Sequence, residues 1–281
     1  MRGEPARRVL ASRAFELTAI DAGFVIEPVP THLGVRTWQQ VGRPTLLVPV
    51  GSTEQHGPHL PLMTDTAIAI AVTEALARQL QADGVDVVIA PAIAYGASGE
   101  HQAFPGTISI GHEALTLMLI EFGRSACSWA ERIVFVNGHG GNLSTLADAV
   151  PRLRAEGRDV AWVPCAPATG GSTRDTHAGR TEASLMLHLH PETVHSDRFV
   201  AGLTAPLGEI LPLLREAGVI AVSPNGVLGD PRGATAVQGG ELLVAMCDAA
   251  MQRVRGGKVA ASGCLELGVD SGAAPPASPA G

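Results

Sequence analysis

Short apolar runs alternate along this chain with longer amphipathic stretches, and this alternation limits the folds open to it. The runs are rich in valine and isoleucine and lie at 45–50, 85–90, 132–136 and 159–164. The stretches between them repeat apolar residues at helical spacing and lie at 66–82, 112–130 and 142–156. Apolar strands separated by helices are typical of a parallel sheet covered on both faces. We therefore predict an α/β fold with a mostly parallel sheet.

Two of these helices carry further signals at their ends or inside them. Thr64 or Asp65 is placed to cap the helix at 66–82, and Gly84 stands just past its end. Pro151 lies inside the helix at 142–156 and should kink or break it. The second half of that helix is therefore expected to be irregular.

The 281 residues divide into one folded part and two flanking segments. Residues 1–32 are interpreted as an N-terminal extension, since Pro28 and Pro30 interrupt them before the first apolar run. Residues 259–281 are small, polar and rich in proline, a composition typical of a disordered tail. We expect a single domain over 33–258, which is long enough to bury a large core.

Charge and cysteine content argue against several classes of partner. The net charge is −7 with no run of Lys or Arg, which argues against a surface that follows nucleic-acid phosphates. The 4 cysteines are far apart and form no C-x-x-C pair, which argues against a disulfide framework or a thiolate zinc site and favours the reducing cytoplasm. No apolar stretch approaches the length of a membrane span. We expect a cytoplasmic protein that binds neither nucleic acid nor membrane.

Polar side chains cluster where the predicted strands end. The segment GSTEQHGPHLPLMTD (51–65) follows the first strand, and NGHGGN (137–142) follows the third. A loop after the fourth strand leads to DTHAGRTE (175–182), and a further loop at 91–110 carries Glu100 and His101, whose roles stay open. Because sites in parallel sheets form beyond the carboxyl ends of the strands, we expect these segments to converge.

The side chains in these segments have the chemistry of metal ligands. Carboxylates and imidazoles without thiolates suit zinc, manganese and iron(II), and five candidates are present: Glu54, His56, Asp65, His139 and Glu182. Asp65 is the expected bridge between two ions, because Glu54 and His56, on opposite sides of an extended segment, could each hold one. Two ions that share a water lower its pKa, which predicts a hydrolase.

The same residues also have simpler interpretations. A lone His or Glu in a loop is usually solvated or caps a helix, and NGHGGN could be a phosphate-binding turn, although Leu143 replaces the third glycine of a dinucleotide fingerprint. YGASGE is no nucleophile elbow, because Glu100 takes the place of its final glycine. His59 is expected to hydrogen-bond a ligand rather than to be one. His188 and His190 are expected to be exposed at a helix end.

Four motifs in order resemble those of the creatininase family of metal-dependent amidohydrolases: T-E-Q-H-G-P-H-L-P-x-x-T-D, F-P-G-T, N-G-H-G-G-N and H-A-G-x-x-E. The match covers roughly residues 35–255. The resemblance implies a three-layer α/β/α sandwich, two divalent metal ions, hydrolysis of a C–N bond and a ring-like homo-oligomer, a hexamer or octamer. It assigns the five candidates above to the metals and His177 to proton transfer at the leaving nitrogen.

One position departs from this resemblance. Members that hydrolyse creatinine read NGHYEN and have a glutamate where this chain has Gly141. Without that carboxylate, Glu182 is expected to serve the second metal. The departure argues against creatinine as the substrate.

Longer segments of the sequence resemble the branch of the family that belongs to the mycofactocin system. These segments are VPVGSTEQHGPHLPL, APAIAYGASGEHQAFPGT and GVLGDP (226–231). This implies a peptidase that releases the C-terminal Val-Tyr dipeptide from a modified precursor peptide, with iron or zinc as its metals and manganese as an alternative. Two other hypotheses stay open. One is an amidohydrolase or formamide hydrolase that acts on a small cyclic or formylated substrate, and the other is a metal-binding scaffold without activity.

Overall fold

The computed structural model of the protein describes residues 32–268. All of the predicted extension at 1–32 except His32, and the end of the predicted tail at 269–281, lie outside the described residues. Four strands form one sheet in the order β2-β1-β3-β4, and every neighbouring pair is parallel. Their bounds are Thr45–Val50 for β1, Val87–Ile89 for β2, Arg132–Asn137 for β3 and Val160–Pro164 for β4. The predicted parallel sheet is therefore confirmed.

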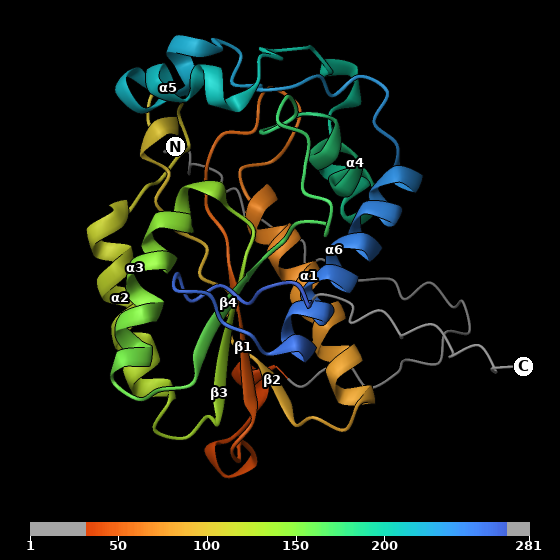
Figure 1. The fold of residues 1–281 in the computed structure, drawn as a ribbon. Helices are drawn as coiled ribbons and strands as arrows, with labels where there is room; N and C mark the ends of the chain where they lie inside the picture. The colour runs from red at the N-terminus through yellow and green to blue at the C-terminus, as the bar shows by residue number, and fades with distance from the viewer. Residues whose placement is uncertain (1–31, 269–281) are drawn as a thin grey trace, which may run out of the picture.

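Helices cover both faces of this sheet (Figure 1). On one face lie α2 (Gly111–Ala126) and α3 (Leu143–Ala155), and on the other lie α1 (Thr64–Ala82) and α6 (Ala236–Gly256). The short α4 (Arg180–Leu189) packs on α6, and α5 (Leu207–Val222) lies beyond the carboxyl ends of the strands. Short 3-10 helices occupy Leu33–Val35, Trp38–Gln40, Gly99–His101, Gly140–Asn142, Pro191–Thr193 and Ser196–Arg198.

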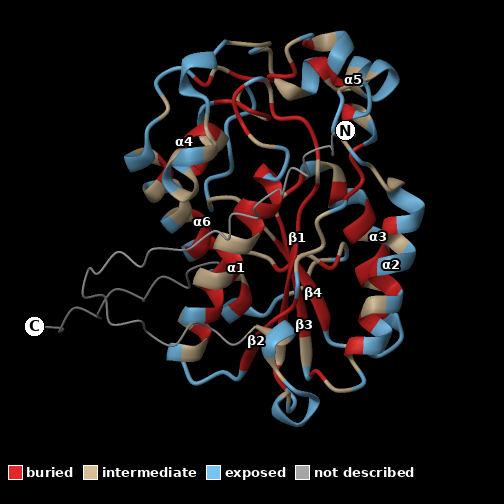
Figure 2. Cartoon of the chain, turned by 180° about the vertical axis from the view of Figure 1, so that it is seen from behind, coloured by how far each residue is buried: buried red, intermediate tan, exposed pale blue. Residues whose placement is uncertain are grey.

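The core lies in two layers, one on each side of the sheet (Figure 2). Successive residues of a strand point to opposite faces, so Leu46 of β1 packs in the same layer as Leu119 of α2, while Leu47 packs with Val72 of α1. All four residues are 0% exposed. Burial on both faces explains why the strands are apolar throughout, and it confirms the three-layer sandwich.

The ends and interiors of the helices differ from the sequence expectations. Neither Thr64 nor Asp65 caps α1, because Met63 takes the cap position and the Thr64 hydroxyl donates to the carbonyl of Pro61 (2.7 Å). We expected Pro151 to kink or break α3, and the break is wrong, since the helix continues to Ala155. The proline lacks an N–H, but the buried side chains of α3 hold the helical path against the sheet: Leu146, Ala149, Val150 and Leu153.

Residues 259–268, which we expected to belong to a disordered tail, instead pack along β4. Leu265 is fully buried, and its backbone N–H donates to the carbonyl of Trp162 (2.9 Å). The indole N–H of Trp162 in turn donates to the carbonyl of Ser262 (2.9 Å). The average composition of this segment does not reveal the contact, because the contact depends on the single apolar side chain of Leu265. No helix within 32–268 is at once long enough and apolar enough to cross a bilayer.

Candidate metal centre

The carboxyl end of the sheet and the first turn of α1 approach each other closely, and two glycines make this possible. A Cβ at Gly51, directly after β1, would stand 2.6 Å from the backbone nitrogen of Thr66. A Cβ at Gly138, directly after β3, would run into the carbonyl oxygen of Asp65. This close approach places the carboxylate of Asp65 beside the loops that leave both strands.

Asp65 is the centre of a buried cluster. Its Oδ1 lies 3.1 Å from Nε2 of His56 and its Oδ2 lies 3.1 Å from Nδ1 of His139. The hydroxyl of Ser52 donates to Oδ2 (2.6 Å). Although burial acts to raise it, contact with His56 and His139 holds the pKa of Asp65 well below its ordinary value. Asp65 is therefore a permanent negative charge between two imidazoles.

Glu54 lies on the other side of His139. Its Oε2 is 3.2 Å from His139 Nε2, and its Oε1 is 3.7 Å from Nδ1 of His177. Glu182 approaches from α4, with Oε2 at 3.7 Å from Nε2 of His56, and it accepts the backbone N–H of Ala178 (2.6 Å). The structure therefore brings together every predicted site residue: Glu54, His56, Asp65, His139, His177 and Glu182.

The predicted orientation of Glu54 and His56 is wrong. Glu54 and His56 do not point to opposite sides, because one ligand atom from each lies within 4.8 Å of the other and of Asp65. Residues two apart on an extended segment share a side. Asp65 still lies between His56 and His139, so a bridging role for it remains a prediction.

The carboxylate of Glu54 gives the clearest indication that this cluster suits a cation. The residue is 0% exposed, and neither of its oxygens has a hydrogen-bond partner. Burial and the nearby charge of Asp65 raise the pKa of Glu54 to about 7. A buried carboxylate without donors is costly unless a cation or proton neutralises it. The donor set of carboxylates and imidazoles at this position therefore fits a divalent metal ion.

The two histidines beside Asp65 favour the charged form, with a proton on both ring nitrogens, as long as no metal is bound. Although burial disfavours the charged form, Asp65 and the other carboxylates raise the pKa of His56 to about 10 and that of His139 to about 9. A metal ligand must present an unprotonated nitrogen, so binding of a metal here would displace these protons.

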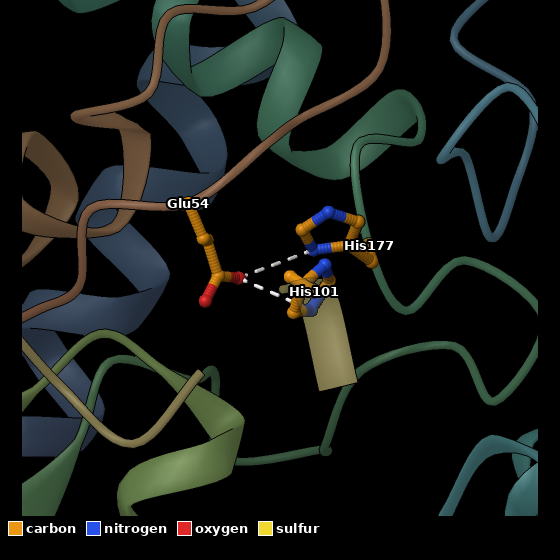
Figure 3. A group of neighbouring side chains, drawn as sticks. All are labelled: Glu54, His101 and His177. Atoms are coloured by element: carbon orange, nitrogen blue, oxygen red, sulfur yellow. Dashed lines mark ion pairs between the residues drawn. The ribbon is translucent and has the colours of Figure 1, made fainter. Parts of the chain in front are cut away.

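Two residues without an assigned role in the sequence complete the cluster. His101 is buried, and its Nε2 lies 3.3 Å from Oε1 of Glu54, on the same side of that carboxylate as His177 (Figure 3). The amide nitrogen of Gln55 reaches both imidazoles, at 2.9 Å from His101 Nδ1 and 3.0 Å from His177 Nε2. His101 could have been found from its loop after a predicted strand. Gln55 carried no such signal, because glutamine is neither a common ligand nor titratable.

Glu100 fills the space beside Gly141. A Cβ at Gly141 would run into Ala97 O and His139 Nε2 and would stand 2.9 Å from Oε1 of Glu100. That same oxygen lies 3.9 Å from His139 Nε2. No side chain fits at position 141 with this arrangement, so the carboxylate near that position comes from the neighbouring loop.

The loop that carries His177 is held in an unusual conformation. Ala178 has φ of 52°, and within 32–268 it is the one non-glycine residue with positive φ. Its carbonyl lies 3.0 Å from Nε2 of His59 and its N–H donates to Glu182, so the peptide groups before and after Ala178 are both fixed. His59 therefore supports the loop beside a predicted ligand, and its contact is with backbone. His188 is exposed, as expected, and His190 is partly buried.

A cavity of about 870 Å³ opens above this cluster. Glu54, Asp65 and His177 line its floor, and α5 contributes Leu207, Leu211, Leu214 and Arg215 to its other wall. A cavity of this volume is in the range of sites that enclose an organic ligand. A ligand in this cavity would therefore lie next to the buried carboxylates.

Comparisons with known proteins agree with this arrangement. The family model described as creatininase, creatinine amidohydrolase, matches residues 35–254. The mycofactocin precursor peptide peptidase of Mycobacterium ulcerans is 55% identical over 233 residues, which cover 81% of this chain and 92% of the relative. A solved mutant creatininase has a TM-score of 0.66 at 27% identity, covering 80% of this chain and 97% of its own. A Zn–Zn form of a mutant creatininase has a TM-score of 0.63 at 25% identity, covering 80% and 96%. The chain belongs to the creatininase family.

Proposed function

We propose that this protein is a metal-dependent peptidase that releases the C-terminal Val-Tyr dipeptide from the modified mycofactocin precursor peptide. The observation that carries the metal-dependent part is the carboxylate of Glu54, which is fully buried without a donor in a cluster of carboxylates and imidazoles. The 55% identity to a mycofactocin precursor peptide peptidase over most of both chains supports the substrate.

The residues of the cluster have distinct tasks in this proposal. Glu54, His56, Asp65, His139 and Glu182 would hold two divalent ions, which when bound lower the pKa of water and polarise a carbonyl. His177 presents Nδ1 to the cluster at 3.7 Å from Glu54 and would give a proton to the departing amine. The wall of leucines on α5 would cover the scissile region and exclude bulk water.

The decisive experiment offers the modified precursor peptide to metal-loaded protein and follows free Val-Tyr by mass spectrometry. We expect dipeptide release that stops when a chelator removes the metal and returns when iron(II), zinc or manganese is restored. Turnover of a formamide or a cyclic amide, without release of the dipeptide, would instead support the amidohydrolase alternative. The proposal would be contradicted altogether if metal analysis found no bound ion and added ions produced no activity.

Iron and zinc are the metals we expect, with manganese as a third, because the ligand set accepts all three. Metal analysis of protein prepared without chelators identifies the occupant. The expected cytoplasmic location can be tested by fractionation of the producing cells.

A ring-like homo-oligomer, a hexamer or octamer, is also part of the proposal. One surface supports it, since Val237 is 75% exposed and Val244 is 61% exposed along α6. Val237 and Val244 stand two helical turns apart and line one shallow hollow on the surface, and contiguous exposed apolar surface marks interaction sites. Light scattering on the purified protein gives the number of subunits, and a monomer would contradict this part.

A further inference from the structure

Gln55 contacts two buried imidazoles at once, because its side-chain amide reaches both rings and its backbone carbonyl reaches that of His177 as well. The side-chain nitrogen of Gln55 lies 2.9 Å from His101 Nδ1, and the backbone oxygen of Gln55 lies 2.8 Å from His177 Nε2. Both rings lie beside the same oxygen of Glu54, at 3.3 and 3.7 Å. The positions of the protons on these rings decide whether each ring presents an N–H or a lone pair to that carboxylate.

The orientation of the Gln55 amide follows from two backbone groups. Its Oε1 accepts the N–H of Gly57 (2.8 Å), and its Nε2 donates to the carbonyl of Gly226 (3.0 Å). Exchanging the two ends of the amide would place oxygen against the carbonyl of Gly226 and nitrogen against the N–H of Gly57. Buried polar groups do not tolerate such mismatches, so Oε1 of the amide faces Gly57 and Nε2 faces Gly226.

The remaining hydrogen of this amide settles the proton on His101. An amide nitrogen has two hydrogens, and one goes to Gly226. Two ring nitrogens lie within reach of the other hydrogen, His101 Nδ1 at 2.9 Å and His177 Nε2 at 3.0 Å. His177 Nε2 also lies 2.8 Å from the backbone carbonyl oxygen of Gln55, which needs a donor, so this nitrogen carries a proton and cannot accept a second one. The hydrogen of the amide therefore goes to His101 Nδ1, which accepts it and carries no proton of its own. The proton of His101 is then on Nε2, the nitrogen that faces Glu54.

The backbone of the same residue settles His177. The carbonyl oxygen of Gln55 has no other hydrogen-bond partner among the described residues, so His177 Nε2 must donate to it. If that nitrogen were unprotonated, two lone pairs would face each other at 2.8 Å in a buried site. Nδ1 of His177 is then the nitrogen free to gain or lose a proton, and it faces Glu54.

We propose that Gln55 is a positioning residue that sets both imidazoles in the Nε2–H tautomer, so that His101 presents an N–H to Glu54 while His177 presents a lone pair. His101 in this arrangement directs its N–H toward Glu54 at 3.3 Å, a polar contact that orients the carboxylate without the geometry of a hydrogen bond. It is not a metal ligand, although a ligand atom of His101 lies within 4.8 Å of ligand atoms of Glu54 and His177. The tautomers follow from hydrogen bonds alone. The use of the His177 lone pair in proton transfer rests on the proposed function.

The test compares the zinc-loaded protein with its Gln55→Glu variant by long-range proton–nitrogen NMR of 15N-labelled histidine. Variants at His101 and at His177 assign the signals. In the wild-type protein we expect an unprotonated Nδ1 and a protonated Nε2 on both rings. In Gln55→Glu the new carboxylate cannot donate, so the proton of His101 should move to Nδ1. The tautomer of His177 should stay, because its partner is a backbone oxygen that every variant keeps.

Metal content and kinetics provide independent readouts. We expect Gln55→Glu to keep the wild-type metal content and to lower kcat for dipeptide release by about 10–100-fold, the range for residues that orient ligands, with a smaller effect on KM. The matched control is Gln102→Glu, which adds the same charge at an exposed neighbour of His101 and should leave tautomers and kcat unchanged.

The outcomes separate this inference from the proposed function. An unprotonated Nε2 on wild-type His101, or a nitrogen shift there that shows direct coordination to zinc, overturns the inference even if the peptide is cleaved. The expected tautomers in a protein that does not release Val-Tyr leave the inference standing and overturn the peptidase. If Gln55→Glu does not fold, the wild-type spectrum alone still decides the tautomers.

Discussion

Asp65 has three neighbours that hold it in place, and it is the best point at which to test the centre by mutation. The imidazoles of His56 and His139 and the hydroxyl of Ser52 all contact this one carboxylate. Loss of the carboxylate leaves two buried imidazoles without their counter-charge.

Asp65→Ala should therefore abolish metal binding, and in metal-free protein it should lower the free energy of unfolding by about 3–5 kcal/mol, as expected when one partner of a buried ion pair is removed. Metal analysis and urea denaturation measure the two effects. The control is Asp83→Ala at the other end of α1, whose exposed pair with Arg255 should contribute only about 0–1 kcal/mol. An Asp65→Ala protein that retains two ions would contradict the assigned role.

Residues of the site differ in how far sequence alone could place them. The six predicted residues were recognisable because carboxylates and imidazoles at strand ends are chemically unusual. The role of Gln55 depends on the direction of an amide, which only the positions of Gly57 and Gly226 reveal. The prediction that Glu54 and His56 lie on opposite sides was wrong because side chains alternate along an extended segment. Residues two apart therefore share a side.

At the scale of elements, the junction of β1 with α1 positions the centre. Gly51 ends the strand directly against the backbone of Thr66, so the helix starts close enough to place Asp65 among the histidines. Helix and strand positions were predictable from periodicity. The path of α3 through Pro151 and the docking of 259–268 were not, because both depend on packing between elements distant in sequence.

Gly51→Ala should force α1 away from the sheet, since its Cβ would stand 2.6 Å from Thr66 N. We expect a loss of about 1–3 kcal/mol, the usual cost of overpacking, together with weaker metal binding as Asp65 shifts. Denaturant unfolding and metal titration measure both. Gly34→Ala, where a Cβ would meet nothing within 4 Å, is the control. Equal stability of the two variants would show that the junction is loose.

The segment after α6 offers a second test at this scale. Leu265 is fully buried against β4, so Leu265→Ala should destabilise the protein by about 2–5 kcal/mol. Leu267→Ala, at a partly buried neighbour, should cost less. A denaturation midpoint for Leu265→Ala equal to that of the unmodified protein would restore the expectation of a disordered tail from 259 onward.

At the scale of the whole molecule, the metal and the stability of the fold are linked through pH. Burial raises the pKa of Glu54 from 4.5 to about 7, with the charge of Asp65 as a further cause. Between these two values the folded metal-free protein keeps a proton that the unfolded chain has released. Stability from this group is therefore present at low pH and is lost as pH rises through 7.

A bound cation takes the place of that proton, so the loaded protein should not lose this stability. We expect the difference in Tm between metal-loaded and chelator-treated protein to be larger at pH 8 than at pH 5. Thermal unfolding followed by circular dichroism at both pH values measures it. A difference that is equal at the two values, or smaller at pH 8, would mean that Glu54 does not face the ion.

The spread of the cluster along the chain has a consequence for how the protein is made. The unit of β1 and α1 supplies Glu54, His56 and Asp65, while His139 follows β3 and Glu182 lies in α4. A growing chain on the ribosome therefore cannot assemble the full set until α4 has been synthesised, and the layer that α6 completes comes later still. The proposed ions can accordingly find all their ligands only after α4 has left the ribosome, so a fully loaded centre would mark a chain in which β1, β3 and α4 have come together.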